Sequence, residues 1–348
     1  MKILALDLGK NNSVACSYDV ETHKAEYRRL ETTASAIRRL VRAMRPDRVV
    51  FEVGTPAGWV YDAVRPLVGS VEVANPTHEG WRWRNVKRKT DRLDALKLAR
   101  LSAAGQLPTV YMPTKQVREH RALIAYRGKL VARRTRVKNT IRSLLHRQGL
   151  SAPSGPAGWT RKAREQLEQW ARPLEQTDET TLWRGELYEE LQSLARLEGQ
   201  LGRVEDRLDS LSRMDARVRR LRTIPCVGPR TAELLVAVLD DPRRFSNGRQ
   251  VASYVGLVPR QYQSGQSDRM GRITKQGHRQ LRRMLVEVSW VALRYNPDLR
   301  EVYRRTRRGS RTRSKIAIVA VARKLLVTAW AMLRDGTVWH SRLRQAAA

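Results

Sequence analysis

Two aspartates stand three residues apart in the segment KRKTDRLDALKLARL, residues 87–101. On a helix, Asp91 and Asp94 would share one face, where like charges repel by roughly 0.2–0.5 kcal/mol. Two further acids stand where strands are expected to end. Asp7 closes the alternating segment MKILALD, and Glu52 closes the apolar run VVFE. Carboxylates gathered at one point are strongly unfavourable unless cations lie between them.

Four carboxylates at strand and helix ends would suit hard cations, because Mg²⁺ and Mn²⁺ prefer oxygen ligands. A pair of such ions about 4 Å apart stabilises the attacking and leaving oxygens of an in-line phosphoryl displacement. Each acid taken alone has an ordinary explanation as a surface charge or a helix cap. Taken together, Asp7, Glu52, Asp91 and Asp94 predict a phosphoryl-transfer centre that uses Mg²⁺ or Mn²⁺.

The charge of the chain indicates the kind of partner. Its 348 residues include 68 Lys and Arg against 34 Asp and Glu, a formal net charge of +34. A protein with that much like charge attracts polyanions, so nucleic acid is the expected partner. No membrane is expected, since no apolar run approaches the roughly 18–20 residues that a span needs. The start MKILALDLGKNN lacks the features of a signal peptide, and the two cysteines have no metal-ligand spacing. We expect a cytoplasmic protein, and the resemblance described below implies a nucleoid-associated protein of a prokaryote.

Three regions must position these acids. Residues 1–113 read as α/β, with five expected strands and three helices, the last capped by Thr90 and ended by Gly105. Residues 114–221 contain a strongly basic helix and then, over 182–221, leucines at three- and four-residue steps. That spacing predicts one long helix in a coiled-coil arm between molecules, or a helical hairpin that packs on itself. Residues 222–348 are predicted to be mostly α-helical.

Several segments resemble the transposases of insertion-sequence family 110, over nearly the whole chain and in the right order. They are LALDLGKNNS, VVFEVGTPAGWVYDA, NPTHEGWRWRNVKRKTDRLDALKLARL, IPCVGPRTA and SGQSDRMGRITKQGHRQLRRMLVE. The resemblance implies a RuvC-like, RNase H-type domain over residues 1–113, with an Asp-Glu-Asp-Asp tetrad. Matched motif by motif, that tetrad is Asp7, Glu52, Asp91 and Asp94. It also implies a C-terminal transposase domain over residues 222–348.

The same resemblance implies a nucleophilic serine ahead of a Gly-x-Ile-Thr/Ser-Lys-x-Gly segment. Ser264 directly precedes glycine, as the family pattern requires, whereas Ser267 is followed by Asp268. Without the family pattern, a serine in this Gly- and Gln-rich stretch would be read as an ordinary turn residue. We therefore expect Ser264 to form a phosphoserine bond with DNA, aided by metal at the tetrad. The family implies that serine and tetrad meet across the subunits of a homodimer or homotetramer.

Basic residues surround both predicted centres. Arg269, Arg272 and Lys275 follow the serine and are expected to hold the scissile phosphate. Lys87 and Arg88 precede the aspartate pair and are expected to contact the nucleic-acid backbone. The resemblance implies donor and target DNA as substrates. It also implies a structured noncoding RNA, the bridge RNA, that pairs with both.

Three other functions remain open from the sequence. A RuvC-like nuclease or Holliday-junction resolvase would use the same tetrad with activated water as the nucleophile. The segment LALDLGKNNSVAC is also similar to the first phosphate loop of the actin and sugar-kinase ATPases, although no second phosphate loop or adenosine site follows. A nucleic-acid-binding protein without catalysis would share the charge.

Overall fold

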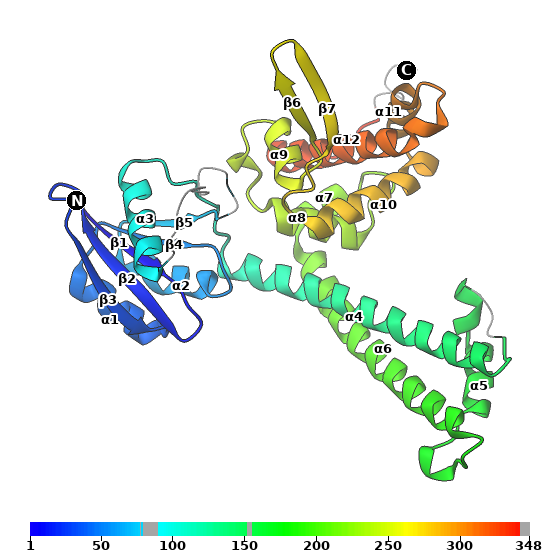
Figure 1. Ribbon diagram of the computed structural model, residues 1–348. Coiled ribbons are helices and arrows are strands. Elements are labelled where there is room, and N and C mark those ends of the chain that lie inside the picture. Colours follow the sequence, from blue (N-terminus) through cyan, green and yellow to red (C-terminus); the bar gives the residue numbers. More distant parts are fainter. Residues whose placement is uncertain (77, 79–89, 152–154, 342–348) are drawn as a thin grey trace. The chain divides into compact units, whose positions relative to one another are not determined.

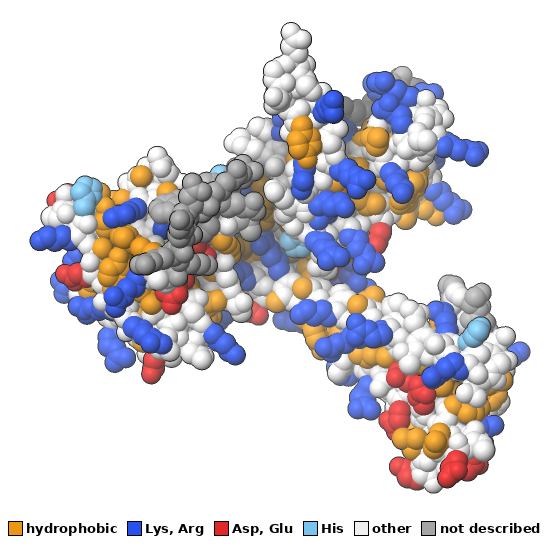
Figure 2. Space-filling model, viewed as in Figure 1, with side chains coloured by type: hydrophobic (Ala, Val, Ile, Leu, Met, Phe, Trp, Pro, Cys, Tyr) orange, Lys and Arg blue, Asp and Glu red, His pale blue; other side chains and the backbone are white. Residues whose placement is uncertain are grey.

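The computed structural model describes residues 1–76, 78, 90–151 and 155–341. These residues form two compact units, Met1–Arg118 and Glu119–Ala348 (Figure 1). Lys and Arg side chains are spread over the displayed face of both units (Figure 2). The predicted boundary between a middle region and a C-terminal domain, at residues 221 and 222, falls inside the second unit and stays a prediction.

The N-terminal unit is built on a five-stranded sheet in the order β3-β2-β1-β4-β5. The first three strands form an antiparallel meander, and β4 and β5 continue the sheet in parallel with β1. The strands are β1 (Lys2–Asp7), β2 (Asn12–Asp19), β3 (Ala25–Glu31), β4 (Arg48–Glu52) and β5 (Ser70–Ala74). The helices are α1 (Ala34–Met44), α2 (Ala57–Val64) with the short η1 (Arg65–Leu67), and α3 (Asp91–Ala103). This mixed α/β unit confirms the fold class predicted for the N-terminal region.

The alternation of side chains divides the sheet into two buried faces. Leu4, Leu6 and Phe51 pack with α1 and α2 on one face. Ile3, Ala5 and Val50 pack on the other face, where they contact Ala95, Leu98 and Ala99 of α3. Because residues two apart in a strand share a face, Asp7 continues the α3 side beyond Ala5, and Glu52 continues it beyond Val50.

Helices α4 (Lys115–Arg147) and α6 (Leu182–Met214) form an antiparallel hairpin, with α5 (Arg161–Trp170) beside its far end (Figure 1). Ion pairs join the two long helices along their length: Arg127–Glu205 at 2.6 Å, Lys138–Glu198 at 3.5 Å and Arg147–Glu186 at 3.1 Å. The leucines at seven-residue steps in α6 are buried within the chain: Leu187, Leu194, Leu201 and Leu208.

Packing within the chain therefore accounts for the leucine spacing. This agrees with the alternative of a helical hairpin that packs on itself. A coiled coil between molecules is not confirmed. The single long helix expected over residues 182–221 is wrong at one point, because α6 ends at Met214. Asp215 then caps a separate helix, α7 (Ala216–Leu221), by accepting the N–H of Arg217 at 2.8 Å.

The C-terminal part of the second unit is mostly helical, as predicted. Its elements are α8 (Pro229–Leu239), α9 (Gly248–Val255), β6 (Pro259–Ser264), β7 (Ser267–Ile273), α10 (Arg279–Tyr295), α11 (Pro297–Arg307) and α12 (Ser314–Asp335), with short 3₁₀ turns η5 (Pro242–Arg244) and η6 (Arg311–Arg313). Most of the basic segment between α10 and α12 is helix α11. Asn296 caps that helix by accepting the N–H of Leu299 at 3.1 Å, and Pro297 fills its first position.

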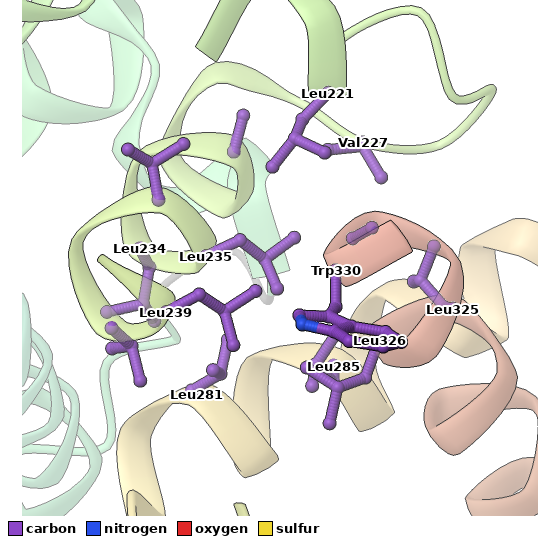
Figure 3. Close-up of a cluster of buried hydrophobic side chains, with 14 of the residues drawn as sticks. Leu221, Val227, Leu234, Leu235, Leu239, Leu281, Leu285, Leu325, Leu326 and Trp330 are labelled. Atoms are coloured by element: carbon purple, nitrogen blue, oxygen red, sulfur yellow. The ribbon is translucent and has the colours of Figure 1, made fainter. Parts of the chain in front are cut away.

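One continuous core holds these helices together. Leu234, Leu235 and Leu239 of α8 face Leu281 and Leu285 of α10 and Leu325, Leu326 and Trp330 of α12 (Figure 3). The Trp330 indole N–H donates to the Pro242 carbonyl oxygen at 2.8 Å, which fixes the ring in the core. This core supports the two-stranded hairpin that carries the predicted nucleophile.

Helix α12 is an exception to the expectation that no apolar run approaches the length of a membrane span. The stretch Arg311–Asp335 is long and apolar enough, by length and composition only, to cross a membrane. In the structure, 56% of its most apolar window is buried within the protein. Packing of α12 in the C-terminal core accounts for its apolar composition.

Candidate active site

The sheet brings two of the predicted acids together. Strands β1 and β4 pair in parallel, with Leu6 opposite Phe51. One residue further in the same register, Asp7 stands opposite Glu52, at the carboxyl ends of two neighbouring central strands. Backbones of neighbouring strands lie about 4.8 Å apart, and both side chains are on the face that α3 covers. Both residues are half-buried.

Helix α3 begins near the same end of the sheet and runs back along β4. Near its C-terminus, the Ser102 carbonyl oxygen accepts a hydrogen bond from Arg48 Nη1 at 3.1 Å, at the start of β4. Stepping back along the helix from Ser102 to Asp94 covers about 12 Å at 1.5 Å per residue. Stepping along β4 from Arg48 to Glu52 covers about 13 Å at 3.3 Å per residue. The first turn of α3 therefore lies at the end of the sheet where Asp7 and Glu52 stand.

The first turn of α3 presents its acids toward the sheet. Asp91 and Asp94 lie on the same helical stripe as the buried Ala95 and Leu98. The Thr90 hydroxyl caps the helix by accepting the N–H of Leu93 at 3.3 Å, so the sequence prediction of this cap is confirmed. Asp94 is half-buried and Asp91 is exposed.

The ends of β1 and β4 and the first turn of α3, which carry the four acids, thus lie at one end of the sheet. The four carboxylates are not arranged there as the ligands of one metal ion. Among the residues that the structure describes, no group of three or more His, Cys, Asp or Glu side chains is spaced to hold a metal ion. Asp7, Glu52 and Asp94 each take part in some interaction within the chain. The donor set itself fits Mg²⁺ or Mn²⁺, since it offers only hard carboxylate oxygens at one end of one sheet face.

Ser264 lies at the tip of a β-hairpin that the sequence analysis did not predict. Strands β6 and β7 form an antiparallel ribbon over residues 259–273, and Ser264 pairs with Ser267 across the two-residue turn Gly265-Gln266. Gly265 adopts a φ of 56°, which glycine accepts without strain. Every residue of β6 is exposed, and the β6–β7 ribbon projects from the helical body (Figure 1).

One face of the β6–β7 ribbon carries the groups that could handle a phosphate. Tyr262 stands opposite Arg269, and Ser264 stands opposite Ser267. Since opposed residues point to the same side and alternate residues share a face, these four side chains lie on one face. Tyr262 is 57% exposed, and its ring crosses Gly271, where an added Cβ would lie 3.0 Å from Tyr262 Cε2. Sequence reasoning missed Tyr262, although the alternation around Ser264 could have indicated it.

The two serines remain alternatives on geometry alone. Both hydroxyls are on the same face, and neighbouring Cα atoms in such a pair lie about 5 Å apart. The adjacent carboxylate, Asp268, lies on the opposite face and accepts hydrogen bonds from Gln261 Nε2 at 3.0 and 3.1 Å. The choice of Ser264 therefore still rests on the glycine that follows it.

The base of the β6–β7 ribbon is held firmly against α9. The Thr274 N–H donates to the Val258 carbonyl oxygen at 2.8 Å. A Cβ on Gly277 would lie 1.9 Å from the Tyr254 carbonyl oxygen, so only glycine fits this position. Arg272 and Lys275 are exposed at this base, and Arg269 is exposed nearer the tip. Lys87 and Arg88, the other predicted nucleic-acid contacts, lie outside the described residues.

His278 has a structural role next to this base. Its Nδ1 accepts the N–H of Leu281 at 3.2 Å and so caps α10. Burial lowers the pKa of His278, and the nearby guanidinium groups of Arg121 and Arg282 lower it further. Protonation of Nδ1 would remove the hydrogen-bond acceptor of the cap.

The stability of the protein should therefore fall as the pH falls. A pKa below the unfolded value of about 6.5 means that the unfolded chain binds the proton more readily, so this stabilisation is complete above that pH and is lost below it. Asparagine also caps helices and does not titrate, so His278→Asn should flatten the fall in melting temperature between about pH 7.5 and 5. His146→Asn, at an exposed position, is the matched control. An unchanged slope in His278→Asn would show that this cap does not carry the effect.

Comparisons with known proteins cover both units. A model described as the transposase IS116/IS110/IS902 family matches residues 218–304, and a second transposase model, for the DEDD domain of IS110, matches residues 4–148. A probable family 20 transposase of Pseudomonas aeruginosa is 29% identical over 97% of this chain and 98% of its own length. A putative transposase of Sinorhizobium fredii, y4rJ, is 30% identical over 84% of this chain and 78% of its own.

Two further similarities are to another transposase and to a solved structure. The transposase for insertion sequence element IS1111A of Coxiella burnetii is 29% identical over 96% of this chain and 90% of its own length. A structure of Thermus thermophilus RuvC aligns with 32% of this chain and 100% of its own, at 15% identity and a TM-score of 0.24.

Proposed function

The chain belongs to the IS110 family of insertion-sequence transposases, and from that premise we propose that it is an RNA-guided recombinase that cuts and rejoins DNA through a bond to Ser264. Membership in a transposase family makes DNA the substrate. The observation that carries the finer proposal is the face of the β6–β7 ribbon, on which Ser264 stands beside Arg269 and Tyr262.

In the proposed step, Ser264 Oγ attacks the phosphorus of a DNA phosphodiester. The new Oγ–P bond replaces the P–O bond to one deoxyribose, the serine proton passes to solvent, and the departing deoxyribose oxygen takes up a proton. The phosphoester energy is kept in the protein–DNA bond, so attack by another DNA hydroxyl reverses the step and rejoins the strands. Arg269 would bind the non-bridging phosphate oxygens through its paired N–H groups. Tyr262 would contact a base or sugar next to the phosphate.

Asp7, Glu52, Asp91 and Asp94 would hold Mg²⁺ or Mn²⁺ at the carboxyl ends of β1 and β4. When bound, the metal would supply Lewis-acid stabilisation for the charge that develops on the phosphate. The proposal requires the tetrad and Ser264 to act on the same phosphodiester. We propose a homodimer or homotetramer in which different subunits contribute these groups. We expect such a protein to act on DNA in the nucleoid.

The RNA-guided part of the proposal is supported by the family resemblance and by the net charge of +34. It predicts that the protein, expressed with its flanking noncoding DNA, co-purifies with one discrete structured RNA. Sequencing of the bound RNA is the measurement, and a nuclease-treated sample is the control that should lose recombination until that RNA is added back. A mixture of unrelated cellular RNAs, with recombination unaffected by nuclease treatment, would contradict RNA guidance.

A further inference from the structure

Helix α12 presents a basic stripe that is partly open to solvent. Ala320, Arg323, Lys324 and Val327 follow the i, i+3, i+4, i+7 spacing of one helical face, and all four are partly or fully exposed. The start of α9 lies against this stripe, because a Cβ on Gly248 would be 2.8 Å from Val327 Cγ1. The hollow between the two helices has a volume of about 620 Å³, and Arg249 of α9 lines it together with Arg323 and Lys324.

A second hollow adjoins the first. It has a volume of about 600 Å³ and lies between α11 and α12. Three arginines from α11 and the turn that follows line it: Arg305, Arg308 and Arg313. Lys324 lines both hollows, so the two lie next to each other on α12. We call the six cations around them the α9–α11–α12 basic surface; they are Arg249, Arg305, Arg308, Arg313, Arg323 and Lys324.

Carboxylates offset little of the positive charge of this surface within the residues that the structure describes. None of the six cations makes an ion pair with a carboxylate in the part of the chain that the structure describes. The nearby Glu301 of α11 is paired with Arg304, which is not among the six, and it lies within electrostatic reach of Arg305, which is. Cations that converge on adjoining hollows repel each other and favour a bound polyanion.

We propose that the α9–α11–α12 basic surface binds the phosphodiester backbone of duplex DNA. The inference rests on the proposed function for its substrate, because the same compact unit carries the Ser264 ribbon. Cations from three elements spread over two hollows match a repeating row of phosphates better than a single small anion. Contacts of this kind fix the register of a duplex without reading its sequence. The surface would therefore hold a flank of the DNA while the β6–β7 ribbon engages the phosphate to be cut.

The test uses full-length protein with Ser264→Ala, so that the DNA stays uncut. Binding of a short fluorescein-labelled DNA duplex is measured by anisotropy over a series of salt concentrations. The double variant Arg323→Ala/Lys324→Ala should bind about tenfold more weakly, and the slope of log K against log salt should shrink by about 2. The matched control is Arg38→Ala/Arg39→Ala on α1, which makes the same change in net charge at exposed positions. It should change both quantities much less.

A second variant guards against a folding defect in α12. Arg249→Ala/Arg305→Ala removes cations of the same surface from α9 and α11, and it should weaken binding in the same way while the melting temperature stays unchanged. Equal effects of the α12 variant and the α1 control would overturn the proposal, as would a loss confined to a structured RNA probe. Since the assay involves no cleavage, it succeeds or fails independently of the serine chemistry.

Discussion

Replacing Ser264 by alanine should abolish the covalent protein–DNA adduct. The hydroxyl is the only atom group removed, so DNA binding and folding should be unchanged while recombination falls by about 10⁴-fold or more, as it does when other enzymes lose a nucleophilic serine. The measurement is a denaturing gel of labelled DNA incubated with protein, RNA and divalent metal. DNA that migrates with the protein reports the adduct.

Ser267→Ala is the matched control for that experiment. Ser267 stands opposite Ser264 on the same face of the ribbon, and both serines are exposed. If Ser264 is the nucleophile, Ser267→Ala keeps the adduct. An adduct that persists in Ser264→Ala and disappears in Ser267→Ala would transfer the role to the other serine. A wild-type protein that cuts DNA without any adduct would favour the RuvC-like nuclease or resolvase, in which water attacks.

Replacing Asp94 by asparagine should lower the rate of cleavage by at least about a hundredfold. The amide keeps the shape of the side chain but removes the charge that would hold a divalent cation beside Asp7 and Glu52. DNA binding should persist, because the net charge of the chain becomes slightly more positive. Glu26→Gln is a suitable control, since Glu26 is an exposed carboxylate on the edge strand β3. Cleavage that is unaffected by Asp94→Asn would remove Asp94 from the site.

Asp91→Asn tests whether the metal centre serves the serine. If the acidic tetrad and Ser264 act on one phosphate, Asp91→Asn and Ser264→Ala should block the same reaction step. Neither variant should then form the adduct. Normal adduct formation by Asp91→Asn, followed by a failure to rejoin the strands, would show that the tetrad acts in a different step.

The sequence predicted the N-terminal unit well because local signals there agree with the tertiary packing. Asp7 and Glu52 are the last residues of β1 and β4, which are neighbours in the sheet. The apolar run before each acid indicated its strand correctly. Thr90 and Gly105 marked the ends of α3, since a side-chain cap and a residue with positive φ are short-range features. What the sequence could not give was the register that sets Asp7 opposite Glu52, because register depends on pairing between distant segments.

The errors in the second unit have specific causes. The β6–β7 ribbon is exposed on both faces, so it lacks the apolar alternation by which strands are recognised. Helix α11 was not predicted because it is strongly basic and only Leu299 is buried, so it shows little apolar periodicity. Asn296 followed by Pro297 is nevertheless a recognisable helix start. The leucine spacing of α6 was detected, but the same pattern serves a partner helix in the same chain or in another molecule.

The central claim is that a protein serine, and not water, attacks the DNA. The most direct measurement is to digest the wild-type protein–DNA adduct with protease and nuclease and to identify the modified peptide by mass spectrometry. The account predicts a nucleotide joined through phosphate to Ser264. Cleaved DNA whose new phosphate carries oxygen from labelled water, with no nucleotide-bearing peptide, would contradict it.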